Sequence, residues 1–116
     1  TPWDRTYAEA LTLSKGTGRP VLLHFSGPRC RACRKMEQVT LADAEVRAYI
    51  AQAFVPLYLD VSGDEETALR FDVAGIPATL ILSAQGEVLA QQLGFQEPKA
   101  FLAWMKDAER RALARP

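Results

Sequence analysis

Hydrophobic and polar positions along the chain follow two different periods. Apolar side chains recur every three or four residues, as in helices with one buried face, at residues 6–14, 30–39, 43–54, 64–71 and 98–112. Short apolar runs bounded by turn residues, typical of buried strands, are found at residues 21–25, 55–61, 79–82 and 87–93. The first helix has two candidate N-caps, Asp4 and Thr6, of which Thr6 has Glu9 at the spacing of a capping box.

The order of these elements predicts the fold class. It reads helix, strand, helix, helix, strand, helix, strand, strand, helix. Strands separated by helices are expected to pair in parallel, and the two strands joined by the tight turn at 84–86 should pair antiparallel. The expectation is an α/β protein with a mixed four-stranded sheet and helices on both faces. A length of 116 residues fits a single domain spanning residues 1–116.

Composition and charge narrow the classes of function. Fourteen Lys and Arg residues balance fourteen Asp and Glu residues, so nothing indicates a nucleic-acid partner or binding to an anionic membrane. The longest apolar run, 79–84, is far shorter than the roughly 20 residues that span a bilayer. We therefore expect no direct membrane insertion, and a monomer. A start at Thr1 fits either a mature secreted protein or a domain of a longer chain, and both interpretations stay open.

The two cysteines carry the candidate chemistry. Cys30 and Cys33 are three positions apart, so a bridge between them would close a very small loop and stabilise the fold little. They follow a buried strand and open a helix, where unpaired N–H groups favour a thiolate on the first cysteine. Positive charge from four nearby residues adds to this effect: Arg29, Arg31, Arg34 and Lys35. The pattern predicts that Cys30 attacks a disulfide and that Cys33 resolves the product.

The cysteine pair has two other interpretations. A structural zinc site usually has four ligands, whereas Cys30, Cys33 and the single histidine, His24, leave one position vacant. The second alternative is that both cysteines are buried and inert. The turn at residues 26–29 argues against it, because this turn should expose Cys30. We therefore expect no metal and no cofactor.

The chain resembles the thioredoxin superfamily, and the resemblance extends over nearly its whole length. The segments that carry the resemblance are 20–25, 30–37, 71–79 and Gly94. The extra helical stretch in 37–54 makes it most similar to the C-terminal thioredoxin-like domain of the bacterial thiol:disulfide interchange proteins of the DsbD family and to related extracytoplasmic proteins. The resemblance implies a thioredoxin fold.

The resemblance also implies roles for the loop Gly75-Ile76-Pro77. In this superfamily the proline is cis and faces the cysteine pair, which base rates for X–Pro bonds alone would not suggest. The Ile76 backbone is then expected to pair with an extended substrate segment. The alternative is a simple loop that precedes a strand.

Three departures from the superfamily pattern surround the cysteines. Arg29 stands where a tryptophan is usual, Arg31-Ala32 replaces Gly-Pro, and His24 replaces a buried acid six residues before Cys30. His24 has two interpretations: it relays the proton of Cys33 during resolution, or it is a neutral core histidine bonded to the backbone. These positions set the redox potential, so the value cannot be transferred from the superfamily.

The predicted function is that of a thiol–disulfide oxidoreductase acting on protein disulfides or dithiols through a mixed disulfide. The resemblance favours a reductant or electron carrier in the periplasm or elsewhere outside the cytoplasm, supplied by a membrane-bound or soluble thiol donor. Stabilisation of the Cys30 thiolate favours the reduced pair. It therefore predicts a reduction potential for Cys30–Cys33 above thioredoxin's value of about −270 mV and below the value of about −120 mV found for the strongest oxidants. The alternative is a non-catalytic thioredoxin-fold module that binds peptides or proteins, for which an intact Cys30–Cys33 pair would be unnecessary.

Overall fold

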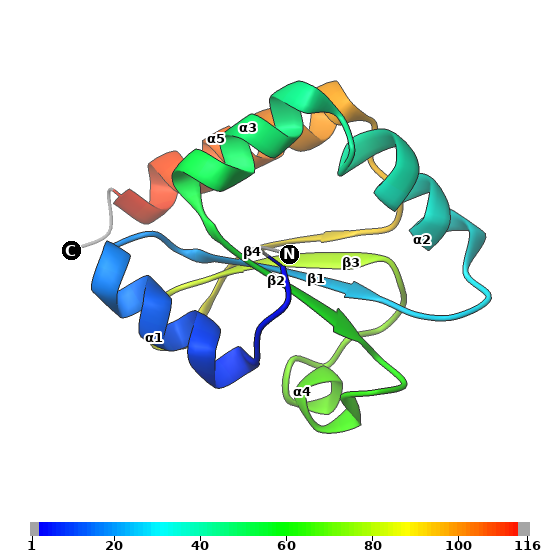
Figure 1. The fold of residues 1–116 in the computed structure, drawn as a ribbon, viewed down its shortest axis with the longest axis horizontal. Helices are drawn as coiled ribbons and strands as arrows, with labels where there is room; N and C mark the ends of the chain where they lie inside the picture. The colour runs from blue at the N-terminus through cyan, green and yellow to red at the C-terminus, as the bar shows by residue number, and fades with distance from the viewer. Residues whose placement is uncertain (1–2, 114–116) are drawn as a thin grey trace.

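A four-stranded sheet lies between two layers of helices in the computed structural model, which describes residues 3–113 (Figure 1). The helices are α1 (Tyr7–Thr17), α2 (Arg31–Lys35), α3 (Ala44–Ala53), α4 (Glu65–Arg70) and α5 (Pro98–Leu113), and the strands are β1 (Val21–Ser26), β2 (Val55–Asp60), β3 (Ala78–Leu82) and β4 (Val88–Leu93). This order matches the one expected from the sequence. The capping box of Thr6 and Glu9 starts α1, which decides between the two candidate N-caps.

The helical stretch expected at 30–39 changes its geometry halfway. After α2, a π-helical turn, η1 (Met36–Thr40), continues the segment. The Leu41 N–H donates to the carbonyl of Met36, five residues earlier, at 2.8 Å. The Thr40 hydroxyl donates to the Gln96 carbonyl at 2.5 Å, which attaches this turn to the segment that follows β4. π-turns of this kind are often found next to functional sites.

The sheet has the order β2-β1-β3-β4, and one expectation about its pairing is wrong. β1 and β2 are parallel and β3 and β4 antiparallel, as expected, but β3 pairs antiparallel with β1 although helices separate the two strands. The reason is the length of α4. Its six residues extend about 9 Å at 1.5 Å per residue, whereas a six-residue strand extends about 20 Å. α4 alone is therefore too short to run back along a whole strand, and β3 starts at the end of the sheet where β1 and β2 finish.

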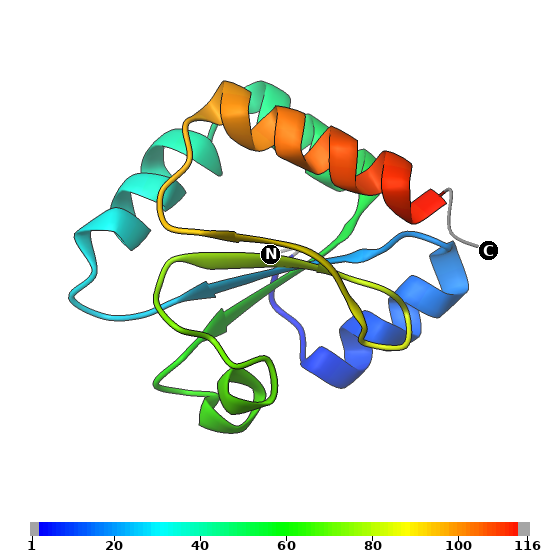
Figure 2. The ribbon, with the colours of Figure 1, turned by 180° about the vertical axis from the view of Figure 1, so that it is seen from behind.

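Helices cover both faces of the sheet, as the sequence predicts (Figures 1 and 2). On one face, Leu22 of β1 and Ile81 of β3 pack against buried residues of α3 and α5, including Phe101. On the other face, Leu23 of β1 packs with Ala10 of α1, and α4 covers the remainder. β1 is buried along its whole length because it is an inner strand with helices on both sides. No helix within residues 3–113 is both long enough and apolar enough to cross a membrane.

Asp43 is expected to contribute about 1 kcal/mol to folding as the N-cap of α3. Its carboxylate accepts a hydrogen bond from the Val46 N–H at 3.1 Å, which satisfies a donor that the helix itself leaves unpaired. Asp43→Ala should lower the free energy of unfolding in urea by this amount. Gln52→Ala, an exposed position of the same helix, serves as control. Equal losses in the two variants would contradict the role of Asp43 as a cap.

Candidate functional site

The cysteine pair lies just beyond the carboxyl end of β1. Cys30 is the N-cap of α2, and Cys33 lies one turn further along the helix. The two residues form a disulfide, with their Cα atoms 5.2 Å apart. Cys33 is fully buried, whereas Cys30 is half-buried. This asymmetry agrees with the expectation that the turn before α2 exposes Cys30.

The start of the helix provides the electrostatic environment of Cys30. The Cys33 N–H donates to the Cys30 Sγ at 3.1 Å, so one of the unpaired N–H groups of the helix points at this sulfur. The helical segment runs without interruption through α2 and η1. The N–H contact and the helix dipole both favour a negative charge on Cys30 after reduction. The geometry is suited to a nucleophilic thiolate.

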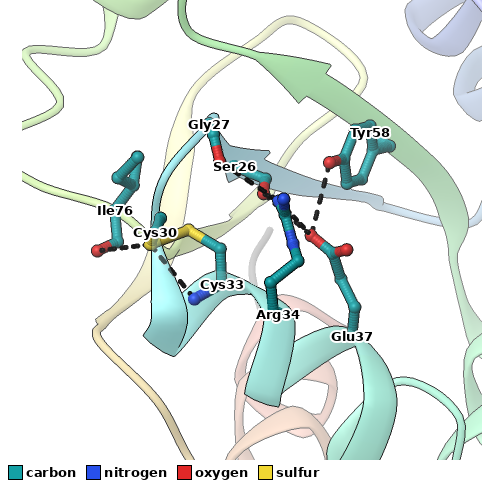
Figure 3. The surroundings of a disulfide bond; sticks show 8 residues. All are labelled: Ser26, Gly27, Cys30, Cys33, Arg34, Glu37, Tyr58 and Ile76. Carbon is teal, nitrogen blue, oxygen red and sulfur yellow. Dashed lines mark hydrogen bonds and ion pairs between the residues drawn. A yellow bond between two sulfur atoms is a disulfide. The ribbon is translucent and has the colours of Figure 1, made fainter.

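The loop that carries Gly75, Ile76 and Pro77 faces the cysteines. Since β3 runs antiparallel to β1, with Ala78 opposite Phe25, residues that precede β3 lie beside the end of β1. The Ile76 carbonyl oxygen is 3.8 Å from the Cys30 Sγ, and the Ile76–Pro77 peptide bond is cis, as the resemblance implied (Figure 3). The Gly94 N–H donates to the Pro77 carbonyl at 2.7 Å. The structure thus brings this loop to the disulfide.

Gly27 allows the close approach of the two loops. A Cβ atom at this position would lie 2.6 Å from the Ile76 Cδ1 and 3.3 Å from the Val61 Cγ2. Both distances are shorter than ordinary van der Waals contact between carbon atoms. A glycine here therefore leaves the space that the Ile76 side chain fills next to the cysteine turn.

A polar network lies on the other side of the cysteine turn (Figure 3). The Glu37 Oε2 accepts hydrogen bonds from the Ser26 hydroxyl at 2.8 Å and the Tyr58 hydroxyl at 3.3 Å. Arg34 donates to the same oxygen at 3.3 Å and to the Gly27 carbonyl at 3.1 Å. The network ties the cysteine helix to β1 and β2, and so holds the turn that carries Cys30.

Glu37 is the site residue that reasoning from the sequence missed. It lies four residues after Cys33 and three after Arg34, and either spacing makes two side chains neighbours on the surface of a helix. That spacing was the available signal for a carboxylate near the cysteines. Its partners Ser26 and Tyr58 come from two different strands, so their meeting depends on the strand register.

His24 is buried in the same region and is fully inaccessible to solvent. The register places it between Tyr58 of β2 and Thr79 of β3. Its Nδ1 is 3.0 Å from the Thr79 hydroxyl, so its partner is a side chain rather than the backbone. Burial lowers the pKa of His24 to about 4, against a smaller opposing effect of the Glu37 carboxylate. With the disulfide formed, His24 is therefore neutral at pH 7.

The second ring nitrogen of His24 stands out among the buried polar atoms. Within residues 3–113, the Nε2 of His24 is the buried side-chain nitrogen or oxygen that has no hydrogen-bond partner. Such a group costs about 1–3 kcal/mol when unpaired. In the part of the chain that the structure describes, no group of three or more His, Cys, Asp or Glu side chains is arranged to hold a metal ion.

Comparisons of sequence place this arrangement among known redox proteins. The chain is 40% identical to the thiol:disulfide interchange protein DsbD of Ralstonia nicotianae over 113 residues. The aligned region covers 93% of this chain and 18% of that protein. It is 30% identical to DsbD of Yersinia pestis (strain Pestoides F) over 101 residues, covering 82% of this chain and 17% of that protein. The chain thus spans less than a fifth of the length of the curated relatives that it matches.

Comparisons of structure agree on the fold. A thioredoxin from Thermus thermophilus superposes with a TM-score of 0.76 at 27% identity, covering 93% of this chain and 84% of that one. The oxidised C-terminal domain of DsbD from Neisseria meningitidis superposes with a TM-score of 0.75 at 23% identity, covering 87% and 90%, and at this identity supports the fold alone. A family model described as a thioredoxin-like domain matches residues 7–109. The chain therefore belongs to the thioredoxin-like domain family.

Proposed function

We propose that this domain is a thiol–disulfide oxidoreductase that exchanges the Cys30–Cys33 dithiol with disulfides of partner proteins. One observation carries the proposal. A half-exposed sulfur at a helix N-terminus is bonded to a fully buried one, next to the carbonyl of Ile76. The 40% identity to a thiol:disulfide interchange protein supports the same chemistry.

The two cysteines take different roles in the proposed reaction. The Cys30 thiolate attacks a partner disulfide and forms a mixed disulfide, and one partner thiol leaves. The Cys33 thiolate then attacks the Cys30 sulfur, the second partner thiol leaves, and the Cys30–Cys33 disulfide closes. The N–H of Cys33 stabilises the attacking sulfur. The accessibility of the two residues supports this order, because a partner can reach Cys30 but not the buried Cys33.

Gly75, Ile76 and Pro77 are proposed to position the partner. The Ile76 carbonyl lies at the Cys30 sulfur, so an extended partner segment that contacts this loop would have its own cysteine within reach. Strand-like addition of a peptide uses backbone hydrogen bonds and is tolerant of sequence. This suits an exchange protein that acts on more than one partner.

His24 is proposed to take the proton of Cys33 during resolution. Its unpaired Nε2 is the available acceptor. Burial lowers the pKa of His24 to about 4, so His24 is a weak base that would hold this proton only transiently.

The biological setting proposed here follows the relatives. The domain acts outside the cytoplasm, in the periplasm, as a reductant or electron carrier that receives electrons from a membrane-bound or soluble thiol donor. Identity to DsbD over nearly the whole chain supports this setting. We further propose that residues 1–116 act as one monomeric domain in this exchange.

Equilibration in a series of glutathione redox buffers, together with reduction of insulin disulfides, tests the proposed function. We expect a reversible two-electron transition with turnover, at a potential above about −270 mV and below about −120 mV, because the helix N-terminus and the adjacent arginines favour the reduced pair. The Cys30→Ser/Cys33→Ser double variant is the control and should show neither. A wild-type protein without turnover would favour the non-catalytic binding module instead.

A further inference from the structure

The positive charge of this neutral chain is concentrated at the reactive pair. Residues 27–36 contain four basic side chains and no acidic one, although basic and acidic residues balance over the whole sequence. Arg29 and Arg31 are the immediate neighbours of Cys30 in the chain. The cysteine turn therefore carries a local excess of positive charge that the composition as a whole conceals.

One of the four charges is neutralised within the protein. Arg34 donates to Glu37 and is close enough to Asp60 to interact with it electrostatically. Figure 3 shows its guanidinium pointing toward Ser26, Gly27 and Glu37.

The other three cations remain available to a partner. Arg29, Arg31 and Lys35 are exposed, and within the described chain no ion pair involves any of them. We call these three residues the basic rim. The Lys35 Nζ lies 4.4 Å from the centre of the Phe95 ring, which places this charge beside the segment that follows β4. On the facing loop, residues 71–77, one acidic residue, Asp72, is exposed.

We propose that the basic rim selects partner proteins whose reactive cysteines are flanked by Asp and Glu. Exposed charges interact over about 8–10 Å at physiological salt, which covers the residues next to a cysteine docked on Cys30. Complementary charge accelerates encounter and disfavours partners of the wrong sign. The inference rests on the proposed disulfide exchange and adds the chemical class of its partner.

Three synthetic disulfide peptides, identical except for Glu, Gln or Lys on either side of each cysteine, test this selection. The reduced protein gives two electrons and two protons to the peptide: the peptide S–S bond breaks, two peptide S–H bonds form, and the Cys30–Cys33 disulfide closes. At low salt the Glu peptide should be reduced about 10-fold faster than the Lys peptide. The ratio should approach 1 in 1 M salt, where the screening length is about 3 Å.

Matched variants assign the effect to the rim. Arg29→Gln/Arg31→Gln should lower the Glu-to-Lys rate ratio by about 3- to 10-fold. Lys15→Gln/Arg47→Gln removes the same charge from exposed positions on α1 and α3 and should change the ratio less than about 2-fold. The rate with the Gln peptide reports any change in the reactivity of Cys30 itself, so the ratio isolates the charge effect.

The outcomes separate the two proposals. If the Gln peptide is reduced but all three rates are equal, or the Lys peptide is preferred, the selection is wrong and the exchange activity stands. If no peptide is reduced, the proposed function fails first. A ratio that the Arg29→Gln/Arg31→Gln variant leaves unchanged would also overturn the role of the rim.

Discussion

Cys33→Ser is expected to convert the domain from a catalyst into a trap for its partners. Cys30 keeps its place at the helix N-terminus, with the backbone N–H of residue 33 directed at its sulfur, and can still form a mixed disulfide. Without the buried thiol, nothing inside the protein resolves that bond. Reduction of insulin should fall on the order of 1,000-fold or more, and disulfide-linked adducts should accumulate on non-reducing gels.

Cys30→Ser is the matched control for this experiment. It removes the accessible sulfur and leaves Cys33, which is fully buried. Turnover should fall to the same extent, but no adducts should form, because a partner cannot reach Cys33. Equal trapping by the two variants would contradict the assignment of Cys30 as the attacking thiol and of Cys33 as the resolving one.

His24 is expected to make the stability of the oxidised protein fall steeply on mild acidification. The folded protein holds the pKa of His24 at about 4, whereas the unfolded chain titrates near the ordinary value of 6.5. Between these pH values the unfolded chain binds more protons, so the stability that is complete above pH 6.5 is lost as the pH falls toward 4. At 1.36 kcal/mol per unit the loss is about 3 kcal/mol.

Comparison with the His24→Asn variant separates the effect of His24 on the pH dependence of stability from the effect of the carboxylates. Asparagine retains a polar atom near the position of Nδ1 for Thr79 but does not titrate. Chemical unfolding at pH 7.5 and pH 4.5, with the disulfide intact, should show a loss about 2–3 kcal/mol smaller in the variant. Thr79→Val keeps the histidine and should retain the wild-type pH dependence. Parallel curves for wild type and His24→Asn would contradict a depressed pKa.

The same variant tests His24 as a proton acceptor. Rapid mixing of a preformed mixed disulfide measures the attack of Cys33 on Cys30 directly. If His24 takes the Cys33 proton, His24→Asn should slow this step and shift its pH profile upward. An unchanged rate and profile would leave His24 with a structural role only.

The local pattern of residues along the chain was sufficient to predict the helices, the strands and the chemistry of the cysteine pair. The apolar periods located every helix and strand in the described chain to within a few residues, because each period reflects one buried face of a single element. The capping box at Thr6 and the place of Cys30 before a helix are likewise local features. The chemistry of the cysteine pair followed from them, since the start of a helix stabilises a thiolate wherever it occurs.

Long-range geometry decided how the site is assembled. The sequence led to a parallel β3, whereas β3 runs antiparallel to β1, and this direction brings Ile76 and Pro77 to Cys30. The meeting of Ser26 and Tyr58 at Glu37 depends on strand register, as does the Thr79 partner of His24. Periodicity shows which face of an element is buried, but not which residue of another element lies opposite. Register and strand direction are set by the packing of the whole chain, and only the tertiary structure contains them.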